Sequence, residues 1–589
     1  MKSQLYSLRP LSIGSLLEKL ESNEIAIPAI QRPFVWKDPR VCDFIDSLYR
    51  GYPIGYIITW PKSGVTLKDG SKSIREFVLI DGQQRTMALG TALQGKSILD
   101  DRYEPKKVRI SFHPVKGEFK VFKKDIENDS EWISDISTIF NANTSYGLIN
   151  DYCEKNQEVN KDKVAESIEH LQGIRSNLLG VIELSEHLDV ETVAEIFARI
   201  NQKGVALDSA DFIMSKMAAS EQFNGHLLHK SIDYFCHLAN KRQAYDELLK
   251  DDAFVQTDYF RGMKWLGKWD NKKIYVPDYK DMLRVVFTMK FERGNLKELV
   301  DRLSGKTMEE SFHKLEDGIK QYINETNFKR FIMILDSAGF IDASMTTATN
   351  AVNCAYILYL TLRAKNVNSG QIEKLVRRWF VMTVLIGRYS RAPQSTFGDD
   401  IRGFTSKEGA GAYLEKIEEA ELSDTFWKVQ IPDGLNRSGN KSVHLNVFLA
   451  SQVKGNDKGF LSSDITVQGL FKGQKDMHHI FPKKYLQRLD VEKSLHNQLA
   501  NKVVMQGEIN KAIRDTEPVV YFSKLQAGCG NGEPPYGAVD NLGDLKANFD
   551  DHCIPFDGVD VSIFKDYDEF LKKRRELMAE KIKSYYYSL

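Results

Sequence analysis

The run His478-His479-Ile480-Phe481-Pro482 constrains the fold of this chain more than any other feature of its sequence. Successive side chains of a β-strand point to opposite faces, so two adjacent histidines on a short hairpin can do separate jobs. Residues 503–505, which are Val-Val-Met, indicate a short buried strand or the start of a helix. Residues 508–514 then favour a helix on which Asn510 and Arg514 lie four apart on one face.

These residue types suit the hydrolysis of a phosphodiester. The reaction needs a general base with a pKa near neutral, which His479 can supply, and a cation that stabilises charge on the phosphate and the leaving oxygen. A hard ion such as Mg²⁺, or Mn²⁺ in its place, keeps most of its waters, so His478 and the amide oxygen of Asn510 suffice as ligands. Asp476 is a weaker candidate for the same metal-binding role.

The His478–Pro482 run, followed by Asn501 and Asn510, resembles the HNH, or ββα-metal, endonucleases. The resemblance implies that His479 is the general base, that His478 and Asn510 hold the metal, and that Asn501 pins the loop that orients the base. Many members of that family have Asp at the position of His478. A histidine there remains a metal ligand but makes metal affinity more sensitive to acid pH.

Basic residues surround this motif, and we expect four of them to contact DNA: Lys483, Lys484, Lys511 and Arg514. His496 and Asn497 could compete with Asn501 for its role. They fall in a polar stretch that indicates a loop, so we expect both on the surface.

A second group of motifs lies near the N-terminus. The apolar run 77–80 predicts a buried strand that leads into Asp81-Gly82-Gln83-Gln84-Arg85, where a helix begins. The N-terminus of a helix favours anions, and Arg32 and Arg85 could together bind a triphosphate through their forked donors. Asp81 could hold a metal or orient a water molecule.

Residues 27–36, which contain Gln31-Arg32, and the Asp-Gly-Gln-Gln-Arg motif resemble the ParB-like N-terminal domain of GmrSD-type restriction proteins. The resemblance implies that this domain binds and hydrolyses a nucleoside triphosphate, with Asp81 and Arg85 taking part in hydrolysis. A third match, residues 197–207, would bring further side chains to the same pocket. The implied nucleotide-binding residues are Gln31, Arg32, Asp81, Gly82, Gln83, Gln84, Arg85, Arg199, Asn201 and Lys203. The chain has no Walker motif, so this prediction depends mainly on the resemblance.

Composition limits the class of protein. A chain of 589 residues with 42% hydrophobic residues can form several cores, and its formal net charge of +0 excludes bulk basicity as the basis of DNA binding. Six cysteines without a Cys-x-x-Cys pair argue against a structural zinc site and a disulfide framework, and favour a reducing cytoplasm. No signal peptide or run of about 18 apolar residues is present, so no membrane association is expected.

The predicted fold class is multidomain α+β. A ParB-like α/β nucleotide-binding domain spans residues 1–215, a mostly helical bridging domain spans 216–425, and a ββα-metal domain with a C-terminal helix spans 426–589. Residues 108–122 alternate like a hairpin. Residues 409–411 and 451–459 suit loops, and residues 567–583 suit an amphipathic helix with Phe570, Leu571, Leu577 and Ile582 on its apolar side.

The sequence thus indicates a nucleotide-dependent DNA endonuclease or nickase of the modification-dependent restriction type, acting in phage defence. Its expected partners are double-stranded DNA, in particular modified phage DNA, and a nucleoside triphosphate, and a homo-oligomer is one arrangement that would let single sites cut both strands. Two other hypotheses stay open. The chain could be a metal-dependent nuclease without triphosphate hydrolysis, or a non-catalytic DNA-binding regulator.

Overall fold

A computed structural model gives the fold of the chain. The residues that it describes are 5–22, 24–26, 34–61, 77–99, 105–141, 144–188, 192–193, 196, 209–220, 223–269, 274–303, 307–438, 442–473, 475–531, 533–556 and 560–589. The chain divides into unit 1, made of Met1–Arg261 and Val300–Phe312, and unit 2, made of Gly262–Leu299 and His313–Leu589. The predicted mixed α+β class is confirmed. The predicted domain boundaries after residues 215 and 425 stay predictions.

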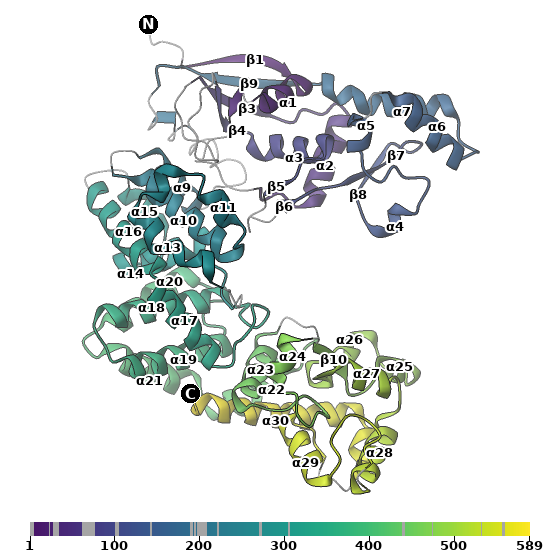
Figure 1. The fold of residues 1–589 in the computed structure, drawn as a ribbon, viewed down its shortest axis with the longest axis vertical. Coiled ribbons are helices and arrows are strands. Elements are labelled where there is room, and N and C mark those ends of the chain that lie inside the picture. The colour runs from purple at the N-terminus through teal and green to yellow at the C-terminus, as the bar shows by residue number, and fades with distance from the viewer. Residues whose placement is uncertain are drawn as a thin grey trace. The chain divides into compact units, whose positions relative to one another are not determined.

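Unit 1 contains a five-stranded mixed sheet in the order β1-β9-β3-β4-β2, and Figure 1 labels β1, β9, β3 and β4. The strands are β1 (Tyr6–Ser12), β2 (Ile25–Ala26), β3 (Tyr56–Trp60), β4 (Phe77–Asp81) and β9 (Leu178–Leu184). β1 pairs antiparallel with β9, β9 parallel with β3, β3 antiparallel with β4, and β4 parallel with β2. One of these strands, β4, falls where the sequence predicts a strand at residues 77–80.

The two faces of this sheet bury different side chains, because consecutive residues of a strand point to opposite sides. Ile57 and Leu79 pack on one face into a large core with helices α1 (Ile13–Glu21), α2 (Asp38–Tyr49) and α3 (Gln83–Gln94). Ile58 and Ile80 join a smaller cluster on the other face. Each core therefore fixes the register of β3 and β4, since a slip by one residue would exchange the buried faces.

The rest of unit 1 is made of small strand pairs and helices. The predicted hairpin at 108–122 is confirmed as β7 (Ile110–His113) paired antiparallel with β8 (Glu118–Val121), and β5 (Ile98–Leu99) pairs with β6 (Pro105–Lys106). The helices are α4 (Lys124–Glu127), α5 (Ser137–Asn141), α6 (Ser145–Lys155), α7 (Lys161–Gln172), η1 (Gly173–Ser176), α9 (Ser209–Ala219), α10 (Gly225–Asn240), α11 (Ala244–Leu248), α12 (Asp252–Val255) and α13 (Asp258–Met263).

Helices also dominate the first part of unit 2, as the sequence predicts. They are η2 (Lys264–Lys268), α14 (Tyr279–Phe291), α17 (Glu325–Ser337), α18 (Thr349–Ala364), α19 (Ser369–Leu385), α20 (Pro393–Thr405), α21 (Gly409–Glu421), the π-helical η3 (Phe426–Gln430), α22 (Ile431–Leu435) and α23 (Val443–Gly455). Helices α15 (Lys297–Arg302) and α16 (Met308–Ile323) each have residues in both units. Twelve consecutive residues of α18, from Ala351 to Leu362, are buried, which makes α18 a central helix of this region.

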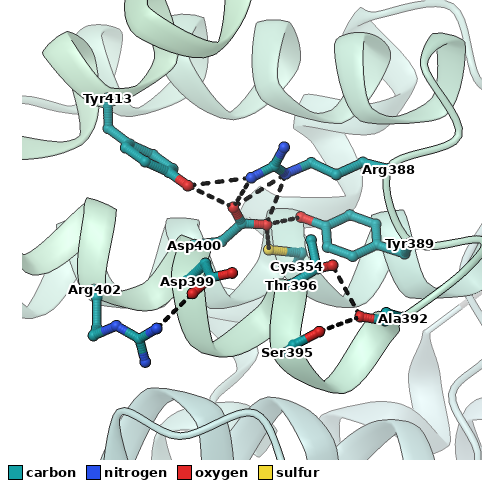
Figure 2. Close-up of polar contacts among 10 residues, drawn as sticks. All are labelled: Cys354, Arg388, Tyr389, Ala392, Ser395, Thr396, Asp399, Asp400, Arg402 and Tyr413. Atoms are coloured by element: carbon teal, nitrogen blue, oxygen red, sulfur yellow. Dashed lines mark hydrogen bonds and ion pairs between the residues drawn. The ribbon is translucent and has the colours of Figure 1, made fainter.

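A buried carboxylate joins α20 to its neighbours (Figure 2). Asp400 has no exposed side-chain surface and pairs with Arg388 at 2.5 Å. Its oxygens also accept hydrogen bonds from the hydroxyls of Tyr389 at 2.7 Å and Tyr413 at 3.0 Å. A buried ion pair of this kind persists because hydrogen bonds satisfy the remaining oxygens. The Arg388–Asp400 pair therefore has a structural role within the helical region.

The last part of unit 2 holds a two-stranded sheet surrounded by helices. The strands are β10 (Lys475–His479) and β11 (Lys502–Gln506). The helices are α24 (Val467–Lys472), α25 (Lys483–Arg488), α26 (Lys493–His496), η4 (Leu499–Asn501), α27 (Gly507–Ile513), α28 (Pro518–Gly530), α29 (Leu542–Asp551), η5 (Val561–Lys565) and α30 (Tyr567–Tyr587).

The C-terminal helix α30 packs on both parts of unit 2. Arg574 contacts the η4–β11 segment, whereas the Tyr585 hydroxyl donates a 2.5 Å hydrogen bond to the carbonyl oxygen of Ala338, at the end of α17. Tyr586 donates to Glu418 of α21. The 21-residue helix, about 30 Å long at 1.5 Å per residue, thus joins the helical region to the two-stranded sheet.

Three sequence-based predictions are wrong in detail. Gly409 begins α21 and residues 451–455 belong to α23, because burial of the apolar side chains of each helix outweighs the tendency of glycine and serine to end one. Leu577 is 43% exposed, while Arg574 on the same helix is fully buried.

All six cysteines are free. Among the described residues, no helix is long and apolar enough to cross a membrane.

Candidate active site

The predicted histidine motif lies on β10, beside β11 and helix α27. β10 and β11 pair antiparallel, with His478 opposite Val503 and His479 opposite Lys502. β11 is anchored by its buried residues Val503, Val504 and Met505. Since α27 follows β11 directly, the helix returns across the strands and brings Asn510 to β10. Strand, strand and helix therefore assemble in the order that the sequence predicts.

His478 and Asn510 meet on this hairpin and helix. Nδ1 of His478 lies 2.5 Å from Oδ1 of Asn510, and the His478 side chain is buried. Two neighbouring ligands of one octahedral Mg²⁺ lie about 3 Å apart. Nδ1 of His478 and Oδ1 of Asn510 would therefore have to move apart by about half an ångström to bind one ion. Among the described residues, no cluster of three or more His, Cys, Asp or Glu side chains could hold a metal. The two donors fit an ion that keeps most of its waters.

His479 makes a separate contact. Its Nε2 lies 3.1 Å from Oδ1 of Asn497. The pKa of His479 is lowered to about 4, below the near-neutral value expected of a general base, because burial and the charge of Lys483 outweigh the hydrogen bond with Asn497, which raises it. The imidazole is therefore neutral at pH 7, as an acceptor of a proton must be.

Asn501 is fully buried, and its side-chain amide bonds to backbone groups on both of its atoms. Its Oδ1 accepts from the amide of Phe481 at 2.8 Å, and its Nδ2 donates to the carbonyl oxygens of Phe481 at 3.1 Å and His496 at 3.3 Å. The main chain of Asn501 also accepts from the amide of Ile480. Asn501 thus holds the turn after His479 in place and does not line the cleft.

An open cleft of about 500 Å³ adjoins the two histidines. Its lining residues are Met477, His478, His479, Pro482, Lys483, Lys484, Asn510, Arg514 and Asp515. Three of the four predicted DNA-binding residues therefore line the cleft, and the fourth, Lys511, is exposed on α27. Such lysines and arginines suit contacts with a phosphate backbone. Asp476 lies on β10 opposite Met505.

The sequence did not reveal three residues near the cleft. His496 and Asn497 were expected on the surface, but His496 is buried and Asn497 contacts His479. No local signal distinguishes an asparagine in a polar stretch that folds back on β10 from one that faces solvent. Lys502 is buried opposite His479, and burial lowers its pKa, as does the charge of Lys483. The position of Lys502 on a predicted buried strand, next to Asn501, could have indicated that it lies near the site.

Three long side chains support the backbone of the site from outside. The Tyr521 hydroxyl donates to the carbonyl oxygen of Ile480 at 2.9 Å. The Tyr567 hydroxyl donates to Leu495, also at 2.9 Å. Arg574 donates from Nη1 to the carbonyl oxygens of Ala500 at 2.7 Å and of Lys502 at 3.0 Å. Arg574 has no exposed surface, and burial lowers its pKa to about 10.

The predicted nucleotide motif of unit 1 lies at the end of β4 and the start of α3. Arg85 Nη2 pairs with Asp81 Oδ2 at 2.8 Å, and Arg85 Nη1 donates to the carbonyl oxygen of Ile54 at 3.2 Å. Gly82 has a φ of +101°, and a Cβ there would lie 2.5 Å from Cγ2 of Ile57. Both the turn and the close approach to β3 therefore require glycine at this position.

The two glutamines of the motif have structural partners. The backbone amide of Val35 donates to Oε1 of Gln84 at 2.9 Å, and Gln83 is buried against Met87. The structure therefore brings Asp81 and Arg85 together at the N-terminus of α3. Gln31, Arg32, Arg199, Asn201 and Lys203 lie outside the described residues, so their predicted convergence on Arg85 stays a prediction.

The N-terminal part of the chain has a recognisable family relationship. Residues 13–218 match the family described as GmrSD restriction endonuclease, N-terminal domain. The match supports a GmrSD-type restriction protein, and with it a restriction endonuclease that acts on DNA in phage defence. It includes β2, β3, β4, β9 and the Asp81–Arg85 pair, and it ends before β10. No curated protein matches the sequence.

Proposed function

We propose that the chain is a nucleotide-dependent DNA endonuclease or nickase of the modification-dependent restriction type, with an HNH site on β10, β11 and α27. The observation that supports the proposal most strongly is the contact of His478 with Asn510 beside a neutral His479 at a lysine-lined cleft. The GmrSD match of residues 13–218 supports the restriction role independently of this geometry.

Six residues that line the cleft, together with Asn501 behind it, have a part in the proposed reaction. His479 takes a proton from the attacking water, since its ring is neutral at pH 7. Lys483, Lys484 and Arg514 hold the DNA backbone through its phosphates. Mg²⁺ or Mn²⁺, when bound by His478 and Asn510, supplies positive charge that stabilises the phosphate and the leaving oxygen. Asn501 keeps the turn after His479 in a fixed conformation.

We propose that unit 1 binds and hydrolyses a nucleoside triphosphate. The N-terminus of α3 offers backbone amides to a phosphate, and Arg85 offers its guanidinium beside the carboxylate of Asp81. Since Arg85 is held by both Asp81 and Ile54, its guanidinium is oriented before any ligand binds. The pair would take part in hydrolysis, with Gln31, Arg32, Arg199, Asn201 and Lys203 completing the pocket.

The two activities would be coupled in restriction. Nucleotide binding would limit cutting of host DNA, which requires that the nucleotide bind two states of the protein with different affinity. The protein would meet modified phage DNA in the cytoplasm. A homo-oligomer would allow single HNH sites to cut both strands.

One cleavage experiment tests the proposed function. Modified and unmodified phage DNA are each incubated with the protein, with each nucleoside triphosphate in turn, and with Mg²⁺, Mn²⁺ or a chelator. The proposal requires cleavage or nicking that depends on the metal, on a triphosphate and on the modification. Cleavage without any triphosphate would instead support a simple metal-dependent nuclease, and DNA binding without cleavage would support a regulator.

A further inference from the structure

Asn497 lies against the proposed base but belongs to no motif that the sequence reveals. Its Oδ1 lies 3.1 Å from Nε2 of His479, and its side chain is half-buried. Asn497 follows the end of α26, eighteen residues after His479 in the chain. Only the return of the chain from α26 to β11 brings the two side chains together.

The contact indicates which nitrogen of His479 carries the proton. With Oδ1 of Asn497, rather than its amide nitrogen, facing the ring, Nε2 of His479 donates, because an amide oxygen can only accept. In a neutral imidazole the other nitrogen, Nδ1, is then left without a proton. Nδ1 is therefore the atom of His479 that can take a proton from water.

An amide suits this position better than a carboxylate would. A carboxylate next to Nε2 would favour the imidazolium form of His479 through its charge, and a protonated ring cannot act as a base. The neutral oxygen of Asn497 selects the same tautomer without adding charge. The partner thus orients the ring while leaving it neutral.

The backbone that carries Asn497 is fixed on both sides. Its anchoring hydrogen bonds run from Nε2 of His496 to the carbonyl oxygen of Val491 at 2.7 Å, from the Tyr567 hydroxyl to the carbonyl oxygen of Leu495 at 2.9 Å, and from the amide of Leu499 to the carbonyl oxygen of Arg437 at 2.9 Å. A side chain held on such a segment can impose a ring orientation, because its own position varies little.

Asn501 does not provide the same contact. Both atoms of its side-chain amide bond to backbone groups of Phe481 and His496. The two asparagines therefore have different roles. Asn501 holds the turn after His479, and Asn497 contacts the imidazole ring of His479.

We propose that Asn497 is a positioning residue that holds His479 in the Nε2–H tautomer and presents Nδ1 to the attacking water. This inference rests on the proposed nuclease function. It goes beyond that function because it assigns the reactive atom of the base and the residue that selects it.

Nuclear magnetic resonance tests the tautomer without any cleavage assay. The full chain is labelled with ¹⁵N at histidine, and the His479 signals are assigned by their loss in His479→Gln. The wild-type ring is expected to show protonated Nε2 and unprotonated Nδ1, and Asn497→Ala is expected to give a mixture of tautomers. A wild-type ring with the proton on Nδ1 would overturn the proposal, as would an unchanged tautomer in Asn497→Ala.

Single-turnover cleavage gives the second readout. Asn497→Ala should lower the cleavage rate at saturating DNA about 10- to 100-fold, part of what a general base contributes, with little change in DNA affinity. Asn497→Asp keeps an accepting oxygen of the same shape, but its charge favours the imidazolium form of His479, so it should recover only part of the rate. Asn531→Ala, at an exposed position after α28, serves as a control and should cleave like the wild type.

The outcomes distinguish a failure of the role of Asn497 from a failure of the proposed nuclease function. If Asn497→Ala and Asn497→Asp both cleave at the wild-type rate, Asn497 has no positioning role. If the wild-type protein cuts none of the DNA substrates with either metal, the nuclease function fails, and the spectra still decide whether Asn497 selects the tautomer of His479.

Discussion

The guanidinium of Arg574 donates a hydrogen bond from Nη1 to the carbonyl oxygen of Lys502 at 3.0 Å. The same nitrogen bonds to Ala500, so the two carbonyl groups that flank Asn501 are held by one side chain of the C-terminal helix. Nε and Nη2 of Arg574 both donate to the carbonyl oxygen of His552. The conformation of the proposed active site therefore depends on α30, far along the chain from the histidines.

Replacement of Arg574 should destabilise unit 2 and abolish cleavage. Arg574→Met fills much of the same space but leaves three buried carbonyl groups without this donor, which should cost roughly 3–5 kcal/mol of unfolding free energy. Urea unfolding of the full chain measures the loss. Lys573→Ala is the matched control, because its exposed pair with Glu569 should contribute less than about 1 kcal/mol. Equal stability of the two variants would contradict the role of Arg574.

Stability at acid pH should depend on His552. Burial lowers the pKa of this fully enclosed imidazole to about 3, whereas an unfolded histidine titrates near 6.5. As the pH falls below about 6.5, the unfolded chain gains a proton that the folded chain does not, so stability that is fully present above this pH is lost as the pH falls toward 3.

The variant His552→Gln tests this dependence. It cannot take up the proton, so the loss of unfolding free energy between pH 7 and pH 4 should be smaller by about 3 kcal/mol than in the wild type. Urea unfolding at both pH values measures it, and the result at pH 7 gives the separate cost of losing the contacts with Lys458 and Gln452. The same pH dependence in both proteins would refute the prediction.

The dependence of cleavage on metal concentration should change when residue 478 is replaced. His478→Asp puts a hard, charged oxygen where the imidazole now lies, so half-maximal cleavage should need less Mg²⁺, and the ratio of the cleavage rate with Mn²⁺ to that with Mg²⁺ should fall. Metal titration of the cleavage rate measures both effects. His478→Ala should need far more of either ion. A variant with unchanged metal dependence would show that residue 478 is not a ligand.

Gly82 should be essential to the stability of unit 1. Gly82→Ala places a Cβ against Ile57 at a φ of +101°, and the strain and contact should cost about 2 kcal/mol or more. Gly147→Ala is the matched control, since Gly147 lies in α6 with no heavy atom within 4 Å of the added Cβ. It should be neutral or stabilise the protein by up to about 1 kcal/mol. Thermal unfolding compares the two, and a neutral Gly82→Ala would contradict the account of this turn.

The sequence predicted the parts of the site that follow local rules. The buried run 503–505 and the periodicity of 508–514 indicate β11 and α27, and the spacing of the histidines and asparagines predicts their meeting. The strand before Asp81 and the helix after Gly82 could also be predicted from the sequence, because an apolar run and a glycine determine the local structure of a few neighbouring residues.

Contacts between distant segments could not be predicted in this way. Asn497 reaches His479 only because helices α25 and α26 fold back toward β11. Arg574 is an intermediate case: its Lys-Lys-Arg-Arg run suggests a solvated patch, yet it lies four residues from both Phe570 and Met578 on a helix, on the buried face. The helical periodicity therefore indicates the burial of Arg574 better than the local charge does.

Cleavage by His479→Ala is the most direct test of the proposed active site. Wild type and variant are compared with modified phage DNA, the preferred triphosphate and Mg²⁺ in single-turnover reactions, while gel retardation measures DNA binding. We expect the variant to bind DNA like the wild type and to cleave at least about 100-fold more slowly. Cleavage by His479→Ala at the wild-type rate would show that His479 is not the base and would contradict the assigned site.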